Sequence, residues 1–110
     1  DVSFADQPGV AAYKCGTLGA GPMIGVSPTL DREMKDKLVH IAKDEEIPYQ
    51  MEVMGGSTGT NADAIGTTQS GVRTALISIP LRYMHTPVEV VDLEDIERVA
   101  KLMASYIHHR

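Results

Sequence analysis

The sequence predicts an α/β fold with a mainly parallel sheet. Short apolar segments rich in β-branched residues alternate with segments in which apolar residues recur every three or four positions, as in βαβ units. One apolar run, residues 74–81, is almost unbroken, as expected of a strand that is buried on both faces. Because the chain has 110 residues, of which 43% are hydrophobic, it can form one modest domain but not two.

The first quarter of the chain is expected to contribute two short strands. Residues 1–5 form the first strand, and the turn signal Pro8-Gly9 follows it. A glycine-rich connection then leads to a second strand at residues 22–26.

A helix is expected next, beginning near Ser27-Pro28-Thr29, because proline is favoured in the first helical turn. It runs to about Glu45 with an apolar stripe formed by Leu30, Met34, Leu38, Ile41 and Ala42. His40 lies beside this stripe, and we expect a partly exposed helix residue there rather than a metal ligand.

The middle of the chain combines a strand, a glycine-rich loop and a short helix. Apolar and polar residues alternate over residues 47–53, which predicts a strand. The loop 55–60 follows, and residues 61–65 can form a short helix that ends near Ser70-Gly71.

The last element predicted is a C-terminal helix capped by Asp92. Its apolar positions fit a period of 3.6 residues and are Leu93, Ile96, Val99, Ala100, Leu102, Met103, Tyr106 and Ile107. His108, His109 and Arg110 follow near the helix end, where positive charge suits the helix dipole, and they are not expected to form a metal site.

Charge and cysteine content exclude several classes of function. The net charge is −5 and no block of Lys or Arg is present, so nucleic acid and anionic membranes are not expected partners. The lone Cys15 rules out an internal disulfide, and no apolar run or leader pattern marks a membrane or secretory segment, so a cytoplasmic protein is expected. Asp1 runs directly into a strand pattern, which suggests a piece of a longer polypeptide.

Two groups of residues could carry chemistry. The loop 55–60 could bind an anion through its backbone amides, although it lacks a phosphate-pairing lysine; it could equally be only a tight turn, or Thr60 and Asn61 could hold a substrate's peptide groups. Asp1 and His85 could both face one crevice at the strand ends, and a carboxylate with an imidazole suits Zn²⁺, Co²⁺ or Mn²⁺. Two ligands are too few for a catalytic metal, so most of such a site would lie outside the chain.

Several segments, in this order along the chain, resemble the C-terminal part of the glutamyl aminopeptidase family. They are Asp1-Val-Ser-Phe-Ala-Asp-Gln-Pro-Gly9, Gly19-Ala-Gly-Pro22, Ile47-Pro-Tyr-Gln50, Gly59-Thr-Asn-Ala-Asp-Ala-Ile65, Gly71-Val72 and Ile79-Pro-Leu-Arg-Tyr-Met-His-Thr-Pro-Val-Glu-Val-Val-Asp92. The family includes the tetrahedral (TET) and deblocking aminopeptidases, and some members carry the name cellulase or endoglucanase. The likeness extends over essentially the whole chain.

This resemblance implies a fold and an activity. Residues 1–110 would be the C-terminal portion of a three-layer α/β/α catalytic domain, without its N-terminal portion and inserted β-rich domain. The complete enzyme would be a dinuclear metallo-aminopeptidase that uses two divalent ions, Zn or Co, to remove N-terminal amino acids from peptides.

The resemblance also implies roles for individual residues. Asp1 would bind one metal and His85 the other, while Thr60, Asn61 and, more weakly, Arg82 would contact substrate. Arg82 could instead brace the His85 loop. The family's general-base glutamate and its other ligands precede Asp1, so the chain by itself should be inactive and should need the N-terminal portion of the same protein.

The complete enzyme would act on peptides as a homo-oligomer, from dimer to dodecamer. Two alternatives from other classes remain: a small anion-binding module that uses the loop 55–60, and a noncatalytic oligomerisation domain that pairs through its strand edges.

Overall fold

The structure is a computed structural model that describes residues 1–56, 58–68 and 71–108, with only the backbone described for Tyr13. Ser70, His109 and Arg110, which the sequence assigned to helix ends, lie outside the described residues. The elements in chain order are β1 (Val2–Phe4), a 3₁₀ turn η1 (Ala12–Lys14), β2 (Met23–Val26), α1 (Arg32–Asp44), β3 (Gln50–Val53), α2 (Asn61–Gly66), β4 (Ile77–Arg82), β5 (Val90–Val91) and α3 (Leu93–His108).

The strands form one mixed sheet in the order β1-β4-β2-β3, with β5 also paired to β4. β1 runs parallel to β4 and β2 parallel to β3, whereas β4 is antiparallel to β2 and to β5. Because the parallel pairs contain most of the paired residues, the predicted α/β class with a mainly parallel sheet is confirmed.

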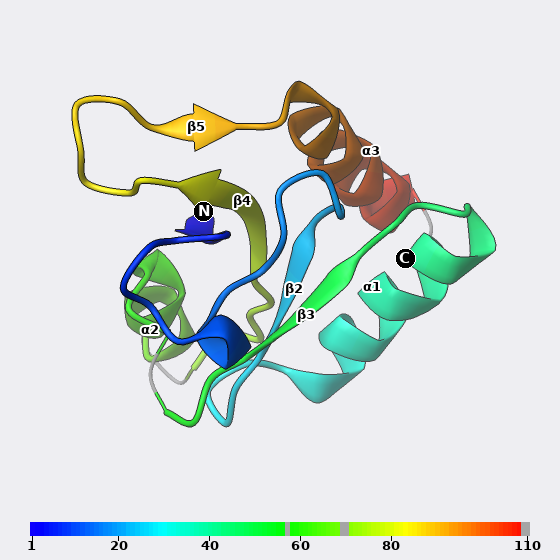
Figure 1. The fold of residues 1–110 in the computed structure, drawn as a ribbon. Helices are drawn as coiled ribbons and strands as arrows, with labels where there is room; N and C mark the ends of the chain where they lie inside the picture. The colour runs from blue at the N-terminus through cyan, green and yellow to red at the C-terminus, as the bar shows by residue number, and fades with distance from the viewer. Residues whose placement is uncertain (57, 69–70, 109–110) are drawn as a thin grey trace.

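The two long helices pack beside each other against the sheet, and Figure 1 places α2 on the opposite side of the molecule from them. Their apolar residues enclose the main core, which contains Ile24, Leu38, Ile41, Ala42, Ile47 and Leu102. Neither helix, nor any other among the described residues, is long and apolar enough to cross a membrane. His40 on α1 is exposed, consistent with a surface position.

The predicted start of α1 at residues 27–29 is wrong. Ser27 and Leu30 close a turn, in which the Leu30 amide donates to the Ser27 carbonyl, and the helix begins only at Arg32. Asp31 is the N-cap, because its carboxylate accepts from the Met34 amide at 2.8 Å. An aspartate cap satisfies one of the unpaired amides of the first turn, which the proline at position 28 cannot do.

Two strands differ from their predicted burial. β4 begins at Ile77 rather than at Thr74, and it is not buried on both faces, because Ile77 and Ile79 remain partly exposed. β3 begins at Gln50 rather than at Ile47, and its apolar Met51 and Val53 are 42% and 78% exposed. β3 ends the strand order, so only β2 pairs with it.

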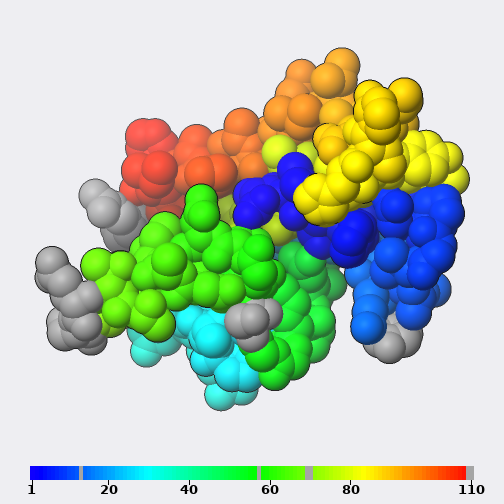
Figure 2. Space-filling model, turned by 90° about the vertical axis from the view of Figure 1, so that its left-hand side faces the viewer, coloured from blue at the N-terminus to red at the C-terminus, as the bar shows by residue number. Residues whose placement is uncertain are grey.

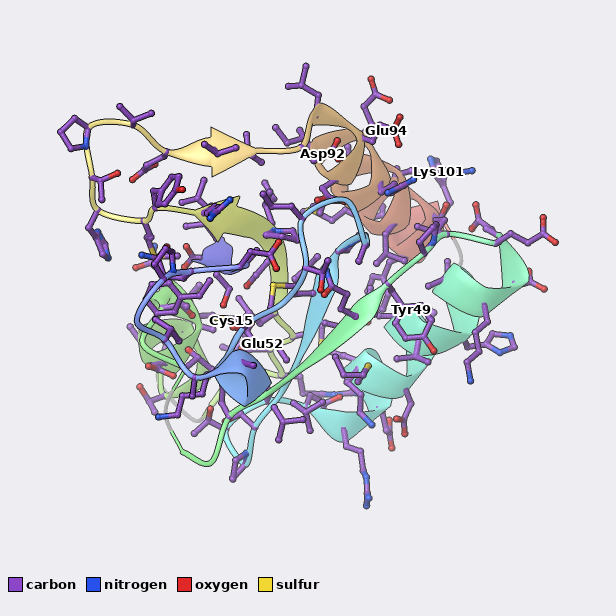
Figure 3. The ribbon with its side chains drawn as sticks, in the orientation of Figure 1. Cys15, Tyr49, Glu52, Asp92, Glu94 and Lys101 are labelled. Carbon is purple, nitrogen blue, oxygen red and sulfur yellow. The ribbon has the colours of Figure 1, made fainter. Side chains whose placement is uncertain are left out.

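α3 begins as predicted. Asp92 accepts a hydrogen bond from the Glu94 amide at 2.9 Å, and Figure 3 shows both residues at the start of the helix. Only part of its apolar surface is covered: Val99 and Leu102 are buried, whereas Leu93 is 73% exposed. The buried face also contains Asp95, a fully buried acid that periodicity did not single out.

Candidate metal and substrate site

A hollow of about 400 Å³ lies where the ends of β1, β3 and β4 meet. Of the predicted site residues, Asp1, Thr60 and His85 line it. Figure 2 shows the dark-blue start of the chain between the green segment that follows β3 and the yellow loop that follows β4. The fold therefore brings together three residues that lie far apart in the sequence.

Backbone pairing with β4 positions Asp1. The Asp1 amino group donates to the Ile77 carbonyl at 3.1 Å, and the Asp1 carbonyl accepts from the Ile79 amide at 2.8 Å. One carboxylate oxygen of Asp1 accepts from the Val2 amide at 2.8 Å. That carboxylate is thereby held beside the hollow with one oxygen not engaged by Val2.

The loop that carries His85 is held in a costly backbone conformation. Tyr83 and His85 have φ angles of 62° and 66°, in the left-handed region that costs a non-glycine residue roughly 1–2 kcal/mol. The side-chain oxygen of Gln7 accepts from the Tyr83 amide at 2.7 Å, and Glu89 accepts from the His85 amide at 3.1 Å. Such conformations persist where the surroundings over-determine them, which is common at functional sites.

Thr60 and Asn61 begin α2 beside the hollow. The Thr60 hydroxyl caps the helix by accepting from the Ala62 amide at 3.2 Å. Asn61 does not line the main hollow but an adjoining pocket, to which Asp1 and Thr60 also contribute. Both residues are therefore placed near Asp1, although only Thr60 reaches the cavity shared with His85.

The amides of the glycine-rich loop are largely engaged within the chain. Asp63 accepts from the Thr58 and Gly59 amides, each at 2.8 Å, and from the Thr58 hydroxyl. The Thr58 amide and then its hydroxyl lower the pKa of Asp63 by stabilising its charged form. A carboxylate of this chain thus occupies amides that an anion would need, which weighs against the anion-binding alternative.

Arg82 is not brought into the hollow. Its guanidinium lies 4.6 Å from the centre of the Tyr83 ring, and its Nε is buried without a hydrogen-bond partner. This contact with the loop of His85 favours the bracing role over contact with substrate. Among the described residues no three His, Cys, Asp or Glu side chains gather as a metal site would require.

Sequence reasoning missed several residues around this hollow. Gln7 and Glu89 hold the His85 loop, and Glu52 and Ser78 line the cavity. The alternation along β3 contained the signal for Glu52, because the residue between Met51 and Val53 must point to the other face of the sheet. Nothing local marked the others.

Comparison with known proteins adds a family to this geometry. The M42 glutamyl aminopeptidase family model matches residues 1–102. The chain is 39% identical over 102 residues to the lysyl aminopeptidase of Pyrococcus furiosus, with 93% of this chain and 30% of that protein covered.

Two solved structures resemble it. One is an aminopeptidase of Desulfurococcus kamchatkensis (TM-score 0.82, 41% identity, 94% and 31% covered). The other is the TET1 peptidase of Pyrococcus horikoshii, described as assembling into a tetrahedron or a large octahedral shell (TM-score 0.64, 28% identity, 92% and 32% covered). The chain therefore spans about 30% of the length of the relatives that it matches.

Proposed function

Because this chain belongs to the M42 glutamyl aminopeptidase family, we propose that it forms the C-terminal part of a metal-dependent enzyme that removes N-terminal amino acids from peptides by two-metal hydrolysis. The observation that carries the proposal is the hollow in which Asp1, Thr60 and His85 converge from separate segments. A carboxylate and an accessible imidazole at one cavity are donors that suit zinc or cobalt.

Asp1 and His85 would each hold one of two divalent ions, Zn or Co. When bound, these metals activate a water molecule and polarise the scissile carbonyl. The chain's own part is to hold the two donors in place: pairing with β4 fixes Asp1, and Gln7 and Glu89 fix the loop of His85. A constrained ligand loses less freedom when it binds.

Thr60 and Asn61 would contact the backbone of the peptide substrate. Both lie beside Asp1 at the start of α2, where a bound peptide next to the metals would pass. Arg82 would act through the His85 loop, by packing against Tyr83, rather than by touching substrate.

The remaining two thirds of an M42 subunit would supply the other metal ligands and the glutamate that serves as general base. Residues 1–110 would then be the C-terminal portion of a three-layer catalytic domain, inactive as an isolated chain. The complete protein would be a cytoplasmic homo-oligomer with no nucleic-acid or membrane partner; the assembly of the TET1 relative supports the oligomer.

A chimera tests the proposal. In it, this chain replaces the region of the P. furiosus enzyme that it matches. The chimera should hydrolyse amino-acid p-nitroanilides with Zn²⁺ or Co²⁺ and lose activity in EDTA. His85→Ala should lower both the rate and the bound metal measured by elemental analysis, whereas His40→Ala, an exposed histidine on α1, should change neither.

Two outcomes would count against it. A folded chimera that binds metal but hydrolyses no peptide substrate would refute the reaction. An active chimera in which His85→Ala leaves both rate and metal content unchanged would refute the ligand assignment.

A further inference from the structure

The floor of the hollow carries a polar cluster that the proposed hydrolysis does not use. Glu52 on β3, labelled in Figure 3, lines the cavity together with Ser3 on β1 and Ser78 on β4. The Ser3 hydroxyl donates to one carboxylate oxygen of Glu52. The other oxygen, Oε1, is buried and has no hydrogen-bond partner.

Ser78 is in the same condition as this oxygen. The residue is 1% exposed, and its hydroxyl is buried without a partner. Buried polar groups are normally hydrogen-bonded, because leaving one unpaired costs the free energy of removing it from water. Two such groups lining one cavity point to a ligand that supplies the missing bonds.

The chemistry of Glu52 defines the ligand. An ionised carboxylate only accepts hydrogen bonds, so its partner must be a donor, and a cationic donor forms the stronger bond. An ammonium group has three donors, enough for both Glu52 and the Ser78 hydroxyl. Lys14 also lines the hollow but is an exposed residue, whereas the unpaired oxygen of Glu52 is buried.

The walls suit a long aliphatic stem. Met54 and Leu76 line the same hollow, and they can pack against the methylene groups of a lysine side chain while its charged end meets the polar floor. A volume of about 400 Å³ accommodates such a side chain.

We propose that this hollow is a specificity subsite for basic N-terminal residues, in which the side-chain ammonium of a substrate lysine binds Glu52 and Ser78. This rests on the proposed aminopeptidase function, because it assigns a preference to the same cavity. The P. furiosus relative bears the name lysyl aminopeptidase, which agrees with a lysine side chain as the occupant.

The test is an NMR titration of the 110-residue chain without metal. The probes are L-lysinamide and L-norleucinamide, which share the α-amino group and differ by the side-chain ammonium. L-lysinamide should shift the backbone amides of Glu52 and Ser78 saturably. L-norleucinamide should need a concentration at least about tenfold higher for the same shift, because it lacks the charged donor.

Variants assign the effect to the cluster. Glu52→Gln should remove the preference for L-lysinamide, and Ser78→Ala should weaken it several-fold. Glu33→Gln is the matched control, because the Glu33 side chain is 86% exposed on α1, and it should leave the preference intact.

Equal binding of the two amides, or an unchanged preference in folded Glu52→Gln, would overturn the proposal. If Glu52→Gln loses its dispersed spectrum, an unchanged preference in Ser78→Ala would do so. Because binding is measured without metal or hydrolysis, a negative result would not bear on the aminopeptidase reaction, and an inactive chimera would not alter the binding result.

Discussion

Replacing Asp95 with alanine should destabilise the fold more than any surface change on α3. The carboxylate is fully buried and accepts from the Gly19 amide at 2.8 Å and the Gly21 amide at 2.9 Å. Its Oδ1 also lies 3.5 Å from the guanidinium of Arg98. Asp95 therefore joins α3 to the loop that precedes β2, a segment distant in the sequence.

The size of the effect follows from the two amides. Each buried amide that loses its acceptor costs about 1–3 kcal/mol, so Asp95→Ala should lower the free energy of unfolding by roughly 2–6 kcal/mol. A domain of this size has a total stability of about 5–15 kcal/mol, which makes the loss a large share of it. Asp95→Asn should cost less, because the amide oxygen can still accept one of the two bonds.

Urea unfolding followed by circular dichroism measures this difference, with hydrogen exchange at the Gly19 and Gly21 amides as a local readout. Glu94→Ala is the matched control: Glu94 pairs with the same Arg98 at 3.1 Å, but its side chain is 72% exposed, so the loss should stay below about 1 kcal/mol. If Asp95→Ala were no more destabilising than Glu94→Ala, the inference that Asp95 holds this loop would be wrong.

Two further predictions concern Gln7 and Arg73. Gln7→Ala should leave the Tyr83 amide without its side-chain acceptor and weaken the Met84 contact, so hydrogen exchange at these amides should accelerate about fivefold, equivalent to about 1 kcal/mol; unchanged rates would contradict a bracing role. Hydrogen bonding by Arg73, followed by that of the Met34 amide, lowers the pKa of Asp31, so Asp31 contributes stability that is full above its ordinary pKa of about 4 and is lost as pH falls through the lower folded value. Arg73→Ala should therefore reduce the loss of stability on acidification below about pH 4, measured by thermal unfolding across pH, and an identical acid dependence would refute this linkage.

Much of the local structure was readable from residue patterns. The apolar stripes predicted α1 and α3, and Asp92 caps α3 as expected. Periodicity succeeds here because a helix is built from contacts between residues three and four positions apart. The ordered motifs also indicated the family, which the match over residues 1–102 confirms.

Burial and partners were decided only by the tertiary structure. The same apolar pattern in α3 leaves Leu93 exposed and buries Leu102, and the alternation in β3 leaves Val53 exposed at the sheet edge. Glu52, Asp95 and Gln7 have no local signature, because their partners lie 49 to 77 positions away. A sequence pattern specifies which residues share a face, whereas the packing of distant segments determines whether that face is covered and which polar group meets which.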